Sequence, residues 1–187
     1  MTELRRVPLH NKHVALGAKM VPFAGWEMPI MYPSGVVSEH LATRRHAGLF
    51  DVSHMGRFVI RGPGALAFLQ HALTNNAAAL EVGQSQYTML PTPTGGVLDD
   101  AYLYHFVSGE YLLVVNAANR EKGWNYLKSH LPVDASSGAR VELVDKSDET
   151  AMISLQGSES RAILLRLLEA GTLPEPLRNE LSSITVA

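Results

Sequence analysis

The sequence predicts an α+β fold with mostly antiparallel sheets and flanking helices. Two observations lead to this fold class. Several expected strands follow one another across short, turn-rich connections, such as Pro91-Thr-Pro-Thr-Gly-Gly96 and Val107-Ser-Gly-Glu110, and short connections favour antiparallel pairing. The expected helices interrupt the strands without the regular alternation of strand and helix that a doubly wound parallel sheet requires.

The elements themselves are expected from local patterns. Runs of β-branched, aromatic and other apolar residues between turn residues predict strands. The expected strands are residues 56–61, 86–90, 97–106, 111–115, 141–144 and 151–155. Apolar residues three or four positions apart predict helices. The expected helices are residues 33–46, 62–73, 119–131 and 158–170. Ser34 is a possible cap of the first helix, and Pro63 suits the first turn of the second.

Composition excludes several classes of function. The chain has 187 residues, enough for one large domain or two small ones, and its 16 Lys+Arg and 18 Asp+Glu leave a formal charge of −2. No basic cluster exceeds a pair, which argues against nucleic-acid or membrane-surface binding driven by charge. The chain has no cysteine, so disulfides, thiolate metal sites and a cysteine nucleophile are excluded. No segment resembles a membrane span or a targeting leader, and a cytoplasmic protein is expected.

Familiar catalytic motifs are missing from the sequence. It contains no Gly-x-x-x-x-Gly-Lys phosphate loop, no His-Glu-x-x-His and no Gly-x-Ser-x-Gly. Gly62-Pro-Gly64 is only part of a dinucleotide fingerprint and suits an ordinary strand-to-helix turn. The histidines are scattered without a convincing ligand spacing, so no metal site is expected.

Asp99 and Asp100 are the strongest candidates for chemistry, because two carboxylates lie inside an apolar strand where Asp is depleted. Alternation sends their side chains to opposite faces. The face of Asp100 also carries Leu98, Tyr102, Tyr104 and Phe106. A carboxylate among aromatic rings is partly desolvated, which strengthens its hydrogen bonds and suits an acid/base or charge-positioning role. The alternative is that both carboxylates lie in the loop and cap the turn at residues 94–96.

Two further segments are ambiguous from their residues alone. Asp51-Val-Ser-His-Met55 follows the first expected helix, and Ser53 or His54 could act as a nucleophile or base, although no third group is visible. The other interpretation is a loop whose polar side chains bond the backbone. Phe23-Ala-Gly-Trp-Glu-Met28 is expected to be an aromatic-rich loop.

Taken together and in order, a set of segments resembles the T-protein family of the glycine cleavage system, the folate-dependent aminomethyltransferases. The segments are Met20-Val-Pro-Phe-Ala-Gly-Trp-Glu-Met-Pro29, Gly48-Leu-Phe-Asp-Val-Ser-His-Met55, Gly95-Gly-Val-Leu-Asp-Asp100, Val114-Val-Asn-Ala-Ala-Asn119 and Leu155-Gln-Gly157. The resemblance runs along essentially the whole chain, and the runs ending in Met55 and Asp100 are its most specific parts.

The resemblance implies a folate-binding, aminomethyltransferase-like fold of three domains. Residues 1–50 and 146–187 would belong to a discontinuous first domain, and residues 51–145 would form the second. The remainder of the first domain and the third domain would be absent from this chain. The apolar run Ser182-Ser-Ile-Thr-Val-Ala187 looks like a strand cut in its middle. We therefore expect the 187-residue chain alone to be inactive and to bind tetrahydrofolate poorly.

By resemblance, the reaction would transfer a one-carbon unit from the aminomethyl-lipoyl arm of the H-protein to tetrahydrofolate, with release of ammonia. Asp100 would be the catalytic residue, bonding the folate N–H and stabilising the positive charge that develops there. The pterin pocket would be lined by Met55, Tyr87, Tyr104, Val114 and Asn116. Tetrahydrofolate would be the co-substrate, lipoylated H-protein the partner, and no metal would be needed.

Two other functions stay open for a chain of this pattern. One is the folate domain of a sarcosine or dimethylglycine dehydrogenase, which would need a flavin domain that this sequence does not encode. The other is a folate-binding assembly factor without transferase activity, whose relatives depart from the Phe-Asp-Val-Ser-His-Met and Asp-Asp runs. The Phe-Ala-Gly-Trp-Glu-Met segment favours the aminomethyltransferase.

Overall fold

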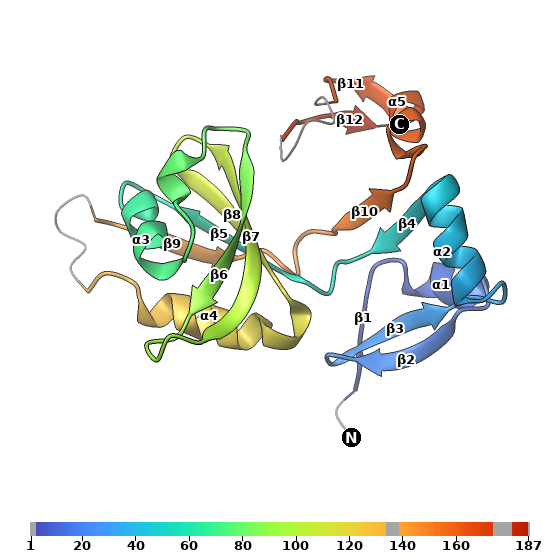
Figure 1. Ribbon diagram of the computed structural model, residues 1–187, viewed down its shortest axis with the longest axis horizontal. Coiled ribbons are helices and arrows are strands. Elements are labelled where there is room, and N and C mark those ends of the chain that lie inside the picture. The colour runs from blue at the N-terminus through green and yellow to red at the C-terminus, as the bar shows by residue number, and fades with distance from the viewer. Residues whose placement is uncertain (1–2, 134–138, 174–180, 187) are drawn as a thin grey trace. The chain divides into compact units, whose positions relative to one another are not determined.

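The computed structural model describes residues 3–133, 139–173 and 181–186 and divides the chain into two compact units. Unit 1 comprises Met1–His54, Thr150–Gly171 and Ile184–Ala187, and unit 2 comprises Met55–Glu149 and Thr172–Ser183. Both units mix helices with sheets that are mainly antiparallel (Figure 1). The predicted α+β class is therefore confirmed. The assignment of residues to a family's first and second domains stays a prediction.

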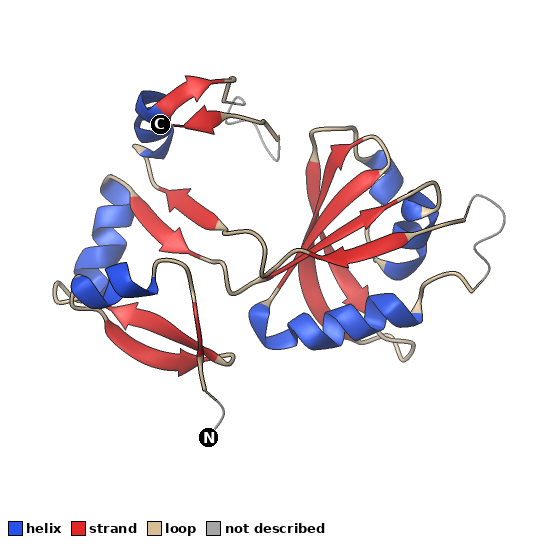
Figure 2. Ribbon diagram, turned by 180° about the vertical axis from the view of Figure 1, so that it is seen from behind, coloured by secondary structure: helices blue, strands red, loops and turns tan. Residues whose placement is uncertain are grey.

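Unit 2 is built on one five-stranded antiparallel sheet in the order β6-β7-β8-β5-β9. Its strands are β5 (Gly56–Arg61), β6 (Ser85–Pro91), β7 (Val97–Val107), β8 (Glu110–Val115) and β9 (Glu142–Asp145). The helical elements of this unit are α3 (Ala65–Ala72), η1 (Ala77–Ala79), η2 (Ala117–Asn119) and α4 (Arg120–Ser129). Figure 2 shows α3 and α4 lying beside this sheet.

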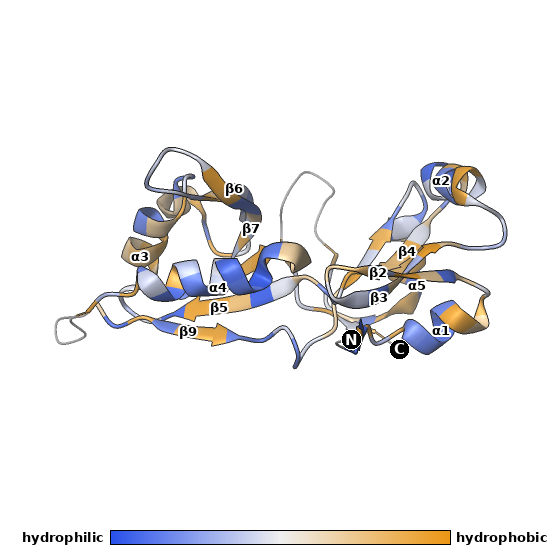
Figure 3. Cartoon of the chain, turned by 90° about the horizontal axis from the view of Figure 1, so that it is seen from below, coloured by the Kyte–Doolittle hydropathy of each residue, from blue (hydrophilic) through white to orange (hydrophobic). Residues whose placement is uncertain are grey.

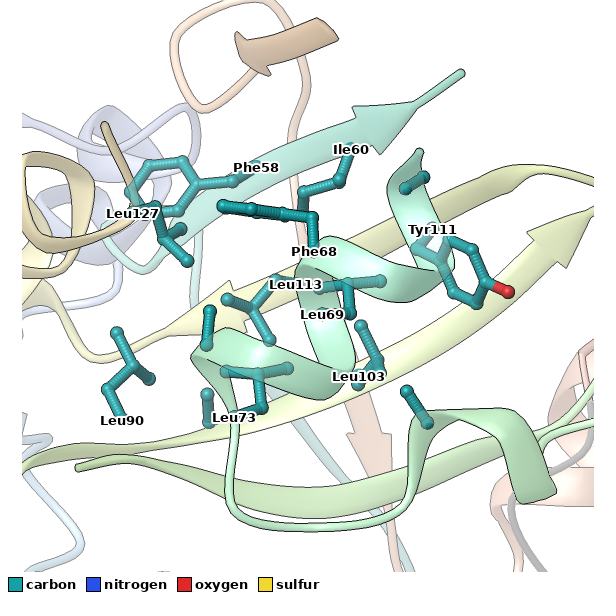
Figure 4. Packing of buried hydrophobic residues seen from close by; sticks show 14 of the residues in the cluster. Phe58, Ile60, Phe68, Leu69, Leu73, Leu90, Leu103, Tyr111, Leu113 and Leu127 are labelled. Atoms are coloured by element: carbon teal, nitrogen blue, oxygen red, sulfur yellow. The ribbon is translucent and has the colours of Figure 1, made fainter. Parts of the chain in front are cut away.

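Alternation along the strands gives unit 2 its core. Phe58, Leu103 and Leu113 stand opposite one another on neighbouring strands and are fully buried. They point toward Phe68 and Leu69 of α3 (Figure 4). Full burial of one such side chain stabilises the fold by about 1.5–3 kcal/mol.

The second helix of unit 2 covers the same face of the sheet. Along α4, hydrophilic and hydrophobic segments alternate (Figure 3). Leu127 is fully buried, and the ring of Trp124 lies 5.0 Å from that of Phe58. The two helices thus cover one face of the sheet. The side chains at the alternate strand positions point to the opposite face.

Unit 1 has smaller sheets. A three-stranded sheet has the order β1-β3-β2, with β1 parallel to β3, and two-stranded sheets pair β10 with β4 and β11 with β12. The strands are β1 (Arg5–Arg6), β2 (Lys19–Phe23), β3 (Trp26–Met31), β4 (Gly48–Asp51), β10 (Ile153–Gln156), β11 (Leu168–Ala170) and β12 (Thr185–Val186). The helices are α1 (His10–Ala15), α2 (Val36–Arg45) and α5 (Ser160–Leu167). No helix among the residues described in the two units is long and apolar enough to cross a membrane.

The helix predictions were wrong at several ends. α2 begins at Val36 because Gly35, with φ of 80°, precedes it, and Ser34 does not cap it. α3 begins at Ala65, so Pro63 lies before the helix. α5 ends at Leu167, and the next residues form β11, which pairs with β12. The apolar run at residues 182–187 therefore contains a paired strand; Ala187 lies outside the described residues.

The aromatic segment at residues 23–28 is not a loop. It is the turn and flanking strand residues of a hairpin in which Phe23 pairs with Trp26. Ala24 and Gly25 both have positive φ, 49° and 82°. Two positive φ values in a two-residue turn match the right-handed twist of a hairpin, which explains the tight connection.

Candidate functional site on the tyrosine face of the sheet

The two adjacent aspartates lie within β7, where Asp99 pairs with Leu90 and Asp100 with Met89 of β6. The alternative that both cap the preceding turn, at residues 94–96, is wrong. That turn is closed by Thr92, whose hydroxyl accepts a hydrogen bond from the backbone N–H of Gly96 at 3.0 Å. Both carboxylates are half-buried.

Asp100 is held by two donors, one from the neighbouring strand β6 and one from the residue that follows β8. The Tyr87 hydroxyl donates to its Oδ2 at 2.9 Å, and the Asn116 Nδ2 donates to its Oδ1 at 2.7 Å. The hydrogen bond to Asp100, with smaller contributions from burial and from the charges of Asp100 and Asp99, raises the pKa of Tyr87 above its ordinary value. Tyr87 therefore stays protonated and remains a donor at neutral pH.

Three tyrosines form the wall beside this carboxylate. Tyr102 pairs with Tyr87 in register, and their ring centroids lie 6.4 Å apart; those of Tyr102 and Tyr104 lie 5.4 Å apart. Burial, and to a smaller degree Tyr102, raises the pKa of Tyr104. Tyr87 is 49% exposed, so the outer part of the wall is accessible to a ligand.

The aliphatic residues predicted for the pocket lie along the same strands. Val114 pairs with Tyr102, so the two share a face, and only 6% of Val114 is exposed. Met55 directly precedes Gly56, the residue that pairs with Val115. Its carbonyl accepts a hydrogen bond from Arg57 at 2.8 Å. That Met55 and Val114 line a pterin pocket stays a prediction.

Because Gly56 has no side chain, the start of β5 can lie close to β8. A Cβ at this position would lie 2.5 Å from Cγ2 of Val115 and 3.1 Å from Cγ of Arg120. A larger residue would push the start of β5, and with it Met55, away from β8.

The sequence pattern missed two contributors. Tyr102 was expected on the Asp100 face, and alternation would have added it to the pocket, since it stands between Tyr87 and Tyr104. Asp99 was expected to point away, yet its Oδ1 accepts a hydrogen bond from Asn116 Nδ2 at 3.0 Å. No local pattern signals that contact, because Asn116 comes from another strand end.

Asp51 and Ser53, in the segment before Met55, support the backbone of unit 1. Both oxygens of Asp51 accept backbone N–H groups, from Leu9 at 2.8 Å and Ser53 at 3.0 Å. The Ser53 hydroxyl donates to the carbonyl of Met152 and accepts from its N–H at 2.9 Å. These contacts fit the interpretation of a loop whose polar side chains bond the backbone.

A cavity of about 440 Å³ lies in unit 1, and its lining includes His13, Tyr32 and Asp51 but not Asp100. The carboxylate expected to carry the chemistry is therefore not at this cavity, although His54 lines it. That Asp100 faces the interior of a folate-sized cavity stays a prediction.

The geometry defines a class of site: an open sheet face with one clamped carboxylate, three tyrosines and an amide. Such a face can hold a flat ring against its aromatic and aliphatic residues and accept hydrogen bonds from the ring's N–H groups. Comparison with known proteins identifies the family to which this site belongs. The family model described as the GCVT N-terminal domain matches residues 9–175. The chain belongs to this family.

Individual relatives agree with this assignment. An aminomethyltransferase of Thermus thermophilus is 50% identical over 166 residues, which are 89% of this chain and 46% of the relative. The aminomethyltransferase of a second strain of the same species is 47% identical over 98% of this chain and 51% of the relative. The crystal structure of glycine cleavage system aminomethyltransferase T from Bartonella henselae has a TM-score of 0.80 at 37% identity, covering 92% of this chain and 48% of that one. The chain spans about half the length of these relatives.

Proposed function

We propose that this chain supplies one wall of the tetrahydrofolate site of a glycine cleavage aminomethyltransferase. The enzyme would take the one-carbon unit from the aminomethyl-lipoyl arm of the H-protein, pass it to tetrahydrofolate and release ammonia. Family membership supports the reaction class. The observation that carries the site is the clamp of Tyr87 and Asn116 on Asp100, which stands beside a tyrosine wall.

The clamp suits the chemistry that the transfer requires. A folate nitrogen attacks the methylene carbon and gains positive charge as the new bond forms. A carboxylate that accepts a hydrogen bond from the folate N–H stabilises this charge. Each oxygen of Asp100 already accepts one hydrogen bond. Since a carboxylate oxygen can accept two, the group keeps capacity for the ligand while its orientation is fixed.

The direct test is Asp100→Asn in an enzyme of full family length that contains this sequence. The substitution keeps the shape and removes the charge. With lipoylated H-protein and tetrahydrofolate, turnover should fall at least tenfold, or about 1.4 kcal/mol of transition-state stabilisation. Unchanged turnover would remove Asp100 from the mechanism.

Two substitutions separate binding from chemistry. In the enzyme of full family length, Asn116→Ala and Tyr104→Phe should weaken tetrahydrofolate binding more than they slow turnover. Each removes a polar contact that contributes about 0.5–1.5 kcal/mol in a buried site. If calorimetry showed parental affinity for both variants, the pocket assignment would be wrong.

A further inference from the structure

The side-chain amide of Asn116 lies between two carboxylates. Its Nδ2 is 2.7 Å from Asp100 Oδ1 and 3.0 Å from Asp99 Oδ1. It also lies 3.4 Å from the carbonyl oxygen of Asp100. All three atoms are acceptors, and an amide nitrogen has two hydrogens to donate. The amide therefore bridges two side chains that alternate to opposite faces of β7.

The bridge is possible because of where Asn116 lies along the chain. It follows Val115, the last residue of β8, which pairs with Ala101 of β7. Asn116 thus stands beside Asp100, at the point where β8 ends. Because the strand has ended, its side chain reaches Asp99 as well as Asp100.

The two carboxylates decide which way the amide points. Ionised carboxylates only accept hydrogen bonds, so an amide oxygen placed between them would be repelled. Nδ2 therefore faces Asp99 and Asp100, and Oδ1, on the opposite side of the planar amide, is directed away from both.

A contribution to stability does not explain why a carboxylate stands at position 99. Its Oδ2 is buried and accepts no hydrogen bond from any residue that the structure describes. A buried oxygen without a donor weakens a fold. Its other oxygen, Oδ1, accepts the hydrogen bond from Asn116. The missing donor to Oδ2 lowers the stability of the fold. The presence of Asp99 despite this loss indicates that its hydrogen bond with Asn116 has a role at the site.

We infer that Asp99 is a positioning residue: it fixes the amide of Asn116 so that Oδ1 is presented to the ligand. This inference rests on the proposed function. With Asp99 in place, the polar edge of the pocket consists of acceptors, the carboxylate of Asp100 and Oδ1 of Asn116. Such an edge selects a ring that offers N–H donors, as a reduced pterin does, and disfavours a ring that offers acceptors there.

The orientation can be tested on the 187-residue chain without activity. In Asp99→Asn the shape is kept, but the side chain at position 99 can then donate as well as accept, so the amide of Asn116 can turn over and is no longer held in one orientation. The ¹⁵N-correlated signals of the Asn116 side-chain amide should shift, and at least one of its protons should exchange faster with solvent. The matched control is Asp148→Asn, which removes the same charge from an exposed ion pair with Arg120 and should leave these signals unchanged.

Stability separates this role from a structural one. Because Oδ2 of Asp99 has no donor among the described residues, Asp99→Asn should unfold in urea at the same concentration as the parent or at a higher one. Asn116 signals identical to the parent, or a marked loss of stability, would overturn the inference.

A kinetic arm keeps this inference distinct from the proposed function. In the full-length enzyme, Asp99→Asn should raise KM for tetrahydrofolate between about two- and tenfold, the effect of one neutral hydrogen bond, with kcat nearly unchanged. Asp100→Asn should lower kcat instead. An unchanged KM in Asp99→Asn would overturn the inference and leave the function standing. Full turnover in Asp100→Asn would contradict the proposed mechanism. The orientation of the Asn116 amide would then be judged from its NMR signals alone.

Discussion

The interiors of the two units differ in chemistry. In unit 2 most of the buried residues are apolar, and Phe58, Leu103 and Leu127 are fully buried in this core; its buried polar residues are Arg57, Ser85, Thr88 and Ser147. In the described part of unit 1 the buried hydrophobic residues are Val7 and Trp26. Its other buried residues are polar, namely His10, His13, Asp51 and Ser53.

This difference shows two ways of holding a chain together. Unit 2 uses the area of apolar surface removed from water, which is non-directional and tolerates variation in detail. Unit 1 relies on directional contacts, such as His13 with the hydroxyl of Tyr32 at 2.6 Å and Asp51 with the N–H of Leu9 at 2.8 Å. Its helices α2 and α5 bury no residue. The site lies on the unit with the apolar core, whose rigid strands fix the clamp on Asp100.

The largest expected effect tests the core of unit 2. Leu103→Ala should cost about 2–5 kcal/mol of unfolding free energy, because it removes a fully buried side chain and leaves a cavity. Leu41→Ala on α2, 39% exposed, should cost no more than about 0.5 kcal/mol. Trp26 lies in unit 1 and Trp124 in unit 2, so backgrounds that keep only one of these two tryptophans report urea unfolding of each unit separately by fluorescence. Equal costs would contradict the contrast between the two interiors.

A second substitution tests the backbone contacts of unit 1. Gly157 has φ of 120°, and a Cβ there would lie 2.4 Å from the carbonyl oxygen of His46 and 2.5 Å from that of Thr43. Gly157→Ala should therefore cost about 2–3 kcal/mol, from strained backbone and overlap together. The readout is urea unfolding followed at Trp26.

The matched control for Gly157 is a glycine that shares only its backbone strain. Gly95 also has positive φ, 82°, but a Cβ there would meet no atom within 4 Å. Gly95 lies in unit 2, so Gly95→Ala is followed at Trp124 and should cost about 1 kcal/mol. If both variants lost the same stability, close packing at the end of α2 would not hold unit 1 together.

The smallest effect is a pH dependence of unit 1. Burial lowers the pKa of His13, and His10 adds to this, while Asp51 opposes it. The unfolded chain therefore binds a proton more readily than the folded one. The contribution of His13 to stability is complete above the ordinary pKa of about 6.5 and is lost as pH falls below it.

His13→Gln isolates this contribution, because glutamine can still hydrogen-bond to Tyr32 but does not titrate. Between about pH 7.5 and pH 5.5, the parent should lose more unfolding free energy than the variant, measured at Trp26. The contributions of other titrating groups cancel in the comparison. Identical pH profiles would show that the environment of His13 does not disfavour its charged form.

Local patterns predicted unit 2 better than unit 1. The strands of the five-stranded sheet were expected almost to their ends, because hydrophobic alternation and Gly/Pro turns mark them clearly. The early strands of unit 1 were not expected. The hairpin of β2 and β3 carries Pro22 and Pro29 and lacks clear alternation, so its residues resembled a loop. The switch from α5 to β11 was missed because pairing with β12, distant in sequence, decides it.

By itself the sequence determined the fold class, the strand that carries Asp100 and the face on which its tyrosines lie. These depend on the two-residue period of a strand, which is a local property. Only the tertiary structure decided that Tyr87 and Asn116 clamp Asp100 and that Asp99 shares the amide of Asn116. Those contacts join two strands, β6 and β7, and the residue that follows β8, and they depend on register. Register is set by how whole strands pair across the sheet, which no short segment of sequence encodes.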